Sequence, residues 1–312
     1  FDFLNGVHDS SNIVATMISS RAFSPRFALG VTAAAEFAGP FIFGVAVATT
    51  IGDEVAVSST ITMNVLLAAL VSAILWNVLT WFLGIPSSSS HALIGGLVGA
   101  VAMGAGFDAI KITGVNKVLV ALFASPIIGL VAGFLFTRLI FFLARGASPK
   151  INTFFQKSQL VTGIALALSH GTNDAQKTMG IITLGLVTAG VIPSFDVPVW
   201  VIAASAGAIA LGTSLGGWRL IKTLGGKFYK VRPVHGFSSQ LTSATVILIA
   251  SAVGGPVSTT QVVSSAIMGA GSAQRVSMVR WGVAKDILIA WVVTIPATAG
   301  VAAMVFWVLE HL

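Results

Sequence analysis

The sequence has no cysteine and very little charge, and both shortages restrict what the protein can be. Without cysteine there are no disulfide bonds and no thiolate metal sites. Charged residues make up 9% of the 312 residues, far fewer than a water-soluble surface needs. The chain also lacks the G-x-x-x-x-G-K-[S/T] loop that binds nucleotide phosphates, which argues against a function driven by ATP.

Apolar sequence, in contrast, is abundant. Hydrophobic residues account for 55% of the chain and the mean hydropathy is +0.95. Runs long enough to cross a bilayer recur along it. We therefore predict an all-α polytopic membrane protein that is embedded in the lipid bilayer. The apolar spans cover residues 26–51, 58–84, 117–145, 158–190, 197–222, 237–255 and 280–310.

Two motifs occur twice, in the same order and at nearly the same separation. NGVHDSSN at residues 5–12 recurs as HGTNDAQK at 170–177, and PSSSSHALIGGLVGA at 86–100 recurs as PVSTTQVVSSAIMGA at 256–270. In the second motif a proline precedes hydroxyl residues and a Gly/Ala-rich run, which is how a helix begins. The duplication predicts two copies of one unit, each with a half-helix hairpin that turns at its proline.

The distribution of charge predicts that the two copies have opposite orientations. Most of the 17 basic residues fall in four loops that contain no acidic residue, at 21–26, 145–158, 219–236 and 272–285. Basic loops stay on the cytoplasmic side. Matching loops of the two copies then lie on opposite sides of the membrane, which is the inverted-topology repeat of many secondary transporters. The basic excess therefore reflects membrane topology and indicates no nucleic acid partner.

We assign the chain to the cell (inner) membrane as a multi-pass protein, with the paired half-helices meeting near the membrane midplane. The predicted units are residues 1–145 as the first inverted repeat, 146–157 as a cytoplasmic linker, and 158–312 as the second inverted repeat.

Asp9 and Asp174 hold equivalent positions in the two copies of the first motif. An aspartate at the centre of a membrane helix costs roughly 2.5 to 3.5 kcal/mol, so each needs a compensating partner. Carboxylate and amide oxygens are hard ligands that suit Na⁺ or H⁺ rather than a transition metal. We predict cation sites with Na⁺ at Asp9 and Asp174; the alternative is hydrogen bonding that only holds the helices together. The predicted cation ligands are Asn5, Asp9, Asn12, Asn173, Asp174 and Glu36.

The hydroxyl residues after each proline predict an anion site. A helix N-terminus carries about half a positive charge and unpaired N–H groups, so two facing ends suit a tetrahedral anion. Two aspartates and an anion would leave this pocket negative, and about two bound cations would bring it close to neutral. The sequence thus indicates symport of an anion with cations. The predicted anion ligands are Ser88, Ser89, Ser90, Ser258, Thr259 and Thr260.

Other polar residues in apolar surroundings have more than one interpretation. Glu36 is either a third cation or proton site, or a neutral or hydrogen-bonded side chain within the bundle. Lys177 adds positive charge to the pocket, extends to the membrane surface, or pairs with Asp174. His91 and Gln261, at equivalent positions, favour a hydrogen-bonding role over a metal or catalytic one.

The four motif segments resemble the inorganic phosphate transporter (Pit) family, which includes the sodium/phosphate symporters, and HGTNDAQKTMG resembles its bacterial form. The resemblance implies a protein that is not an enzyme, needs no cofactor, and imports inorganic phosphate with Na⁺ as coupling ion. It places cations on Asn5, Asp9, Asn173 and Asp174, and phosphate on Ser88, Ser89, Ser258, Thr259 and Gln176. The habit of the family also suggests a homodimer.

The chain departs from the family in ways that bear on the coupling ion. Leu70 and Gln240 stand where eukaryotic members carry acidic residues, and Lys177 stands where they carry asparagine. H⁺-coupled symport of phosphate or of metal-phosphate is therefore an alternative. A sulfate permease and an anion channel are further alternatives. The G-x-S-x-G match at residues 212–216 lies in an apolar span without a paired base, which argues against a hydrolase.

Overall fold

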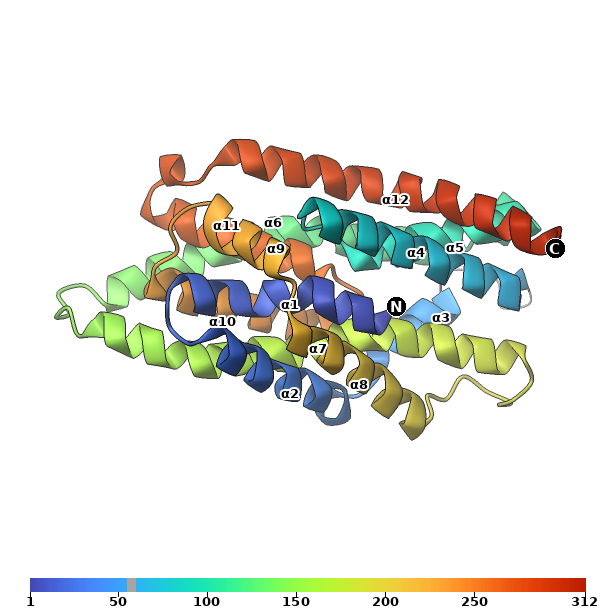
Figure 1. Cartoon of the computed structure of the whole chain (residues 1–312), viewed down its shortest axis with the longest axis horizontal. Coiled ribbons are helices and arrows are strands. Elements are labelled where there is room, and N and C mark those ends of the chain that lie inside the picture. The colour runs from blue at the N-terminus through green and yellow to red at the C-terminus, as the bar shows by residue number, and fades with distance from the viewer. Residues whose placement is uncertain (55–59) are drawn as a thin grey trace.

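The computed structural model describes residues 1–54 and 60–312, and every regular element in these residues is a helix. The longer helices run side by side along the molecule (Figure 1). The first half contains α1 (Asp2–Ser19), α2 (Pro25–Phe43), α3 (Ala46–Glu54), α4 (Met63–Leu83), α5 (Ser89–Ala105) and α6 (Ile112–Leu143). The second half contains α7 (Ile151–Thr188), α8 (Val199–Leu215), α9 (Trp218–Lys222), α10 (Pro233–Ala252), α11 (Thr259–Gln274) and α12 (Trp281–Glu310). Short turns are η2 (Phe107–Ala109), η3 (Thr223–Lys227) and η4 (Val276–Met278).

The helices have the length and composition of membrane spans. Among the described residues, four helices are long and apolar enough to cross a membrane, namely α2, α4, α6 and α12. The bent pair formed by α8 with 218–227 makes a fifth candidate. Large apolar side chains such as Phe142 and Val199 are exposed on the outside, where lipid tails would cover them. The prediction of an all-α multi-pass membrane protein is confirmed.

Two of the predicted spans are not continuous helices. The span 26–51 is divided between α2 and α3 at Gly44, and the span 197–222 is divided between α8 and α9 at Gly216. Both glycines have a positive φ, +80° and +76°, which side chains other than glycine rarely adopt. Hydropathy reports how apolar a segment is but not where it turns, so the prediction of unbroken spans was wrong at both places. In addition, α7 begins at Ile151, inside the segment 146–157 predicted as a linker.

The two hairpins predicted from the proline motifs are present. α4 ends at Leu83, directly before Gly84, and α10 ends at Ala252, shortly before Gly254. Both glycines have a positive φ. The chain then turns through the proline, and α5 and α11 begin at a serine N-cap. The two turns meet, because Ser90 Oγ donates to the Val257 carbonyl at 3.4 Å. We call residues 86–90 and 256–260 the first tip and the second tip.

Each half supplies a packing surface for the hairpin of the other half. Glycines on α5 let it approach the backbone of α12, since a Cβ on Gly99 would collide with Ala299. In the same way α6 approaches α11, since a Cβ on Gly133 would collide with Ala266. These glycines therefore allow close contact between the helices.

Several of the connections between helices lie at the two ends of the molecule. Figure 1 shows the α1–α2, α6–α7 and α11–α12 connections at one end, and the α5–α6 and α7–α8 connections at the other. This path agrees with two oppositely oriented halves. The inverted-topology repeat itself stays a prediction.

Candidate functional site

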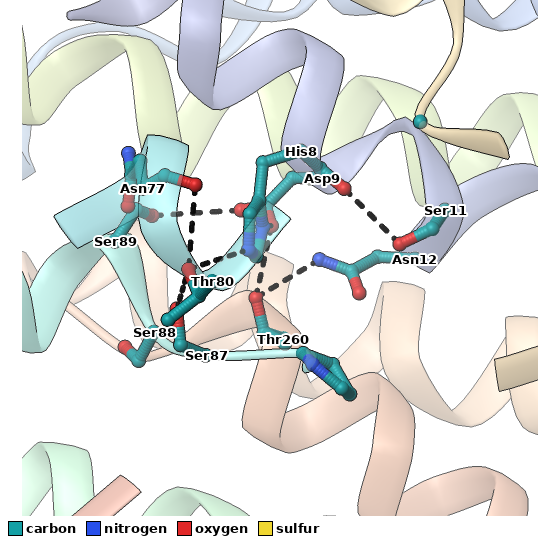
Figure 2. Close-up of polar contacts among 12 residues, drawn as sticks. His8, Asp9, Ser11, Asn12, Asn77, Thr80, Ser87, Ser88, Ser89 and Thr260 are labelled. Carbon is teal, nitrogen blue, oxygen red and sulfur yellow. Dashed lines mark hydrogen bonds and ion pairs between the residues drawn. The ribbon is translucent and has the colours of Figure 1, made fainter. Parts of the chain in front are cut away.

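Asp9 is completely buried on α1, where that helix meets the starts of α5 and α11 (Figure 2). Its Oδ1 lies 2.8 Å from His8 Nδ1 and accepts a hydrogen bond from Thr260 Oγ1 at 3.1 Å. Its Oδ2 accepts from Ser89 Oγ at 3.5 Å. Asn12 Nδ2 donates to the same Thr260 hydroxyl at 3.1 Å. Both tips therefore contact the first aspartate.

Asp174 is equally buried on α7 and contacts the second tip. Its Oδ2 accepts from Thr259 Oγ1 at 2.9 Å, and its Oδ1 pairs with the ammonium of Lys177. That ammonium also donates to Ser90 Oγ at 2.6 Å and to the Val257 carbonyl at 3.0 Å. Of the three interpretations of Lys177, the structure shows the ion pair with Asp174.

The two aspartates are held in matching ways. Ser89 and Thr259, at the same position of the two tips, each contact the aspartate of their own half. The residue three positions after each aspartate, Asn12 or Lys177, contacts the tip of the other half. Predicted cation and anion ligands from both halves thus form one buried cluster.

His170 lies between the two aspartates. Its Nε2 is 3.2 Å from Asp174 Oδ2 and 3.8 Å from Asp9 Oδ2, and its Nδ1 is 2.7 Å from Glu36 Oε1. Ligand atoms of Asp9, His170 and Asp174 all lie within 4.8 Å of one another, which is close enough to share one ion. Glu36 therefore reaches the cluster through His170. No role was predicted for His170, although it stands at the position of Asn5 in the other copy.

Several amide groups in this cluster have hydrogen-bonding capacity left over. Among the described residues, both amide atoms of Asn5 and the amide oxygens of Asn12 and Asn173 have no hydrogen-bond partner, although all three residues are buried. Buried polar atoms normally have a partner. A bound cation would be a suitable partner for these oxygens. Asn77 on α4 lies beside the first tip and has the same unbonded amide.

Helices α4 and α10 provide an outer layer of contacts that the sequence analysis missed. Thr80 Oγ1 lies 3.4 Å from His8 Nε2, and Asn173 Nδ2 donates to Ser251 Oγ at 2.9 Å. Thr80 and Ser251 both stand shortly before the proline of their hairpin. A hydroxyl five or six residues before the proline in both copies was the feature that could have revealed them.

The remaining tip residues form the helix starts. Ser88 and Ser258 cap α5 and α11, because their Oγ atoms accept the N–H of His91 at 3.2 Å and of Gln261 at 3.3 Å. His91 Nδ1 and Gln261 Nε2 are themselves 3.3 Å apart. The hydrogen-bonding role predicted for this pair is confirmed.

Gln176 lies elsewhere. Its Oε1 accepts from the N–H of Val47 at 2.7 Å and of Ala48 at 3.3 Å, and its Nε2 donates to the Gly44 carbonyl at 2.5 Å. The break between α2 and α3 exposes backbone groups that need partners, and Gln176 supplies them. The structure therefore places this residue at the break instead of at the tips, where the resemblance had assigned it.

The comparisons with known proteins agree with this arrangement. The model of the phosphate transporter family matches residues 5–148 and 144–302. The chain belongs to the phosphate transporter family. It is 46% identical to the probable low-affinity inorganic phosphate transporter of Bacillus subtilis, over 99% of this chain and 94% of that protein. Its identity to the protein of the same name in Rhizobium meliloti is 44%, over 98% and 92%.

A similarity to a more distant relative and to a solved structure extends this result. The putative phosphate permease of Thermococcus kodakarensis is 28% identical, over 97% of this chain and 94% of that protein. A solved structure described as the sodium-dependent phosphate transporter is similar with a TM-score of 0.90 and 24% identity, and covers 100% of this chain and 96% of that one. At that identity the likeness shows the fold. The chain is a transporter-family member and not an enzyme.

Proposed function

We propose that the protein imports inorganic phosphate by symport with cations across the cell (inner) membrane of a bacterium. The observation that carries this proposal is the meeting of two hydroxyl-lined helix starts beside two buried aspartates. The names of the bacterial relatives support phosphate as the substrate. A homodimer stays a prediction.

The anion site is the region where the two tips meet. Each tip offers hydroxyl groups and the free N–H groups of a helix start, with about half a positive charge at each start. Hydrogen phosphate accepts such bonds and also carries a proton that a nearby carboxylate can accept, whereas sulfate has no such proton. This difference favours phosphate over sulfate. The ligands we propose are Ser88, Ser89, Ser90, Ser258, Thr259 and Thr260, without Gln176.

The cation sites are centred on the two aspartates. Asp9 has Asn5 and Asn12 on the same helix face, and both carry an unbonded amide oxygen. Asp174 has Asn173 beside it, and Glu36 completes the cluster through His170. Oxygen ligands favour Na⁺, which is also the ion in the name of the structural neighbour. H⁺, with free phosphate or metal-phosphate as cargo, is the alternative.

Charge couples the two sites. The buried carboxylates repel an incoming anion until positive charge neutralises them, so cation and phosphate each favour the binding of the other. This mutual effect is reciprocal by thermodynamic necessity. Cation entry down its gradient then drives phosphate against its own.

The test is uptake of ³²P-phosphate into proteoliposomes containing the purified protein, with Na⁺ and H⁺ gradients applied in separate experiments. We expect saturable, concentrative uptake under one of the two gradients, inhibited by unlabelled phosphate and much less by sulfate. Uptake that only equilibrates phosphate, whatever the gradient, would indicate a channel and refute symport. Stronger inhibition by sulfate than by phosphate would refute the substrate.

A further inference from the structure

We infer that the side chain of Lys177 occupies the second cation site, so that only the Asp9 site takes a cation from solution. The inference deepens the proposed function, since it fixes how many coupling cations the pocket needs. It follows from the partners of the lysine, its burial, its counterpart in the other half, and the charge of the pocket.

Every polar partner of the Lys177 ammonium is an oxygen acceptor. The ammonium contacts a carboxylate oxygen of Asp174, the Ser90 hydroxyl at 2.6 Å and the Val257 carbonyl at 3.0 Å. Carboxylate, hydroxyl and carbonyl oxygens together are the ligands that a hard metal cation selects. A carbonyl oxygen pointing at this position would repel phosphate. The ammonium therefore lies in a place built for a cation, not in one built for the anion.

The lysine is also fixed in this place. Its side chain is 2% exposed, so the ammonium does not extend to the membrane surface. A buried ammonium without its carboxylate would be strongly destabilising, so Lys177 and Asp174 stay paired. Both oxygens of Asp174 are engaged, one by Lys177 and the other by Thr259. A solvent cation would have to displace the ammonium to bind at the Oδ1 side of this carboxylate.

The first half differs at the equivalent position. Asn12 occupies the position equivalent to Lys177. Its neutral amide donates to Thr260 of the second tip, just as the Lys177 ammonium donates to Ser90 of the first tip. In the described part of the chain, no lysine or arginine pairs with Asp9. The two halves thus have matching geometry, but only the second half pairs its aspartate with a lysine.

The charge of the pocket leads to the same conclusion. We count His8 as neutral and Glu36 with His170 as a pair that holds one titratable proton, so that these three residues add no net charge. Asp9, Asp174 and Lys177 then leave a charge of about −1, and the two helix starts bring it to about zero. Phosphate as a monoanion is then balanced by about one cation from solution. Without the ammonium, about two cations would be needed.

The decisive variant is Lys177→Asn, which copies the residue of the first half. It is compared with the wild type in proteoliposomes under a tenfold cation gradient at zero membrane potential, with Na⁺ and H⁺ in separate experiments. Each additional coupled cation multiplies the limiting accumulation of phosphate by the gradient. We expect K177N to accumulate about tenfold more phosphate at equilibrium than the wild type. Lys177→Arg, which keeps the charge, should not show this gain in accumulation.

Binding to the purified protein gives a second measurement that does not depend on transport. If Na⁺ is the coupling ion, equilibrium binding of ²²Na⁺ should show one more ion per chain for K177N than for the wild type. The reciprocal variant Asn12→Lys places an ammonium beside Asp9 and should bind one ion fewer. If K177N fails to yield folded protein, Asn12→Lys still tests the inference.

Several results would overturn the inference. One is an unchanged accumulation ratio in K177N together with a raised phosphate KM, because Lys177 would then be a phosphate ligand. Another is an N12K variant that couples as many cations as the wild type. Failure of the proposed function is distinct, since it would appear as absence of concentrative uptake in the wild type itself.

Discussion

Replacing Thr260 by valine should weaken the cation site without changing its shape. The hydroxyl of Thr260 donates to Asp9 Oδ1 at 3.1 Å and accepts from Asn12 Nδ2 at 3.1 Å (Figure 2). Valine has nearly the same volume but neither bond. The loss of a hydrogen bond to a charged group costs about 1.5 to 3 kcal/mol. If the cation needs this arrangement, its half-saturating concentration should rise between about 10-fold and 150-fold.

The assay is the initial rate of ³²P-phosphate uptake at saturating phosphate, measured over a range of cation concentrations. Thr260→Ser, which keeps the hydroxyl, should behave as the wild type does. A matched control is Thr294→Val on α12, because Thr294 is also buried but donates only to the carbonyl of Ala290 in its own helix. An unchanged cation dependence in T260V would refute the reasoning, whatever happens to the phosphate KM, because Thr260 is also a proposed anion ligand.

Three further predictions concern the carboxylate, the helix start and the packing. Asp9→Asn should yield folded, monodisperse protein that no longer concentrates phosphate; gradient-driven uptake at the wild-type level would refute the cation site. Ser88→Ala removes the cap of α5, which is worth about 0.5 to 2 kcal/mol, and should raise the phosphate KM about 2-fold to 30-fold at an unchanged cation dependence. Gly99→Leu should abolish assembly of the folded helix bundle, because the leucine side chain would collide with the α12 backbone. The control Gly300→Leu places its side chain in open space and should assemble normally. Fluorescence-detected size exclusion measures both.

Duplication is the reason that much of the site could be predicted from the sequence. A single serine run after a proline, or a single aspartate in an apolar span, has many explanations. Two hydroxyl runs and two aspartates, repeated in the same order, leave few explanations. The structure brings Asp9, Asp174 and both tips into one cluster. The overall membrane class followed from hydropathy alone, because lipid-facing helices tolerate few charged residues.

Contacts that depend on how closely helices approach could not be predicted. Glu36 meets His170 because α2 and α7 nearly touch where Gly171 faces the backbone of Glu36. Nothing in the spacing along the chain indicates which glycine faces which helix. The same limit explains Gln176, whose partners exist only because α2 and α3 separate at Gly44.

The exchange of packing surfaces between the halves has a consequence for biosynthesis. α5 is made early, yet the surface that accepts its glycine face belongs to α12, the last of these helices to leave the ribosome. Until α12 has been inserted, the first hairpin lies in the bilayer without this partner helix, and its polar tip is incompletely shielded from lipid. The native substrate pocket can therefore form only after synthesis of nearly the whole chain, and neither half would be expected to build it alone.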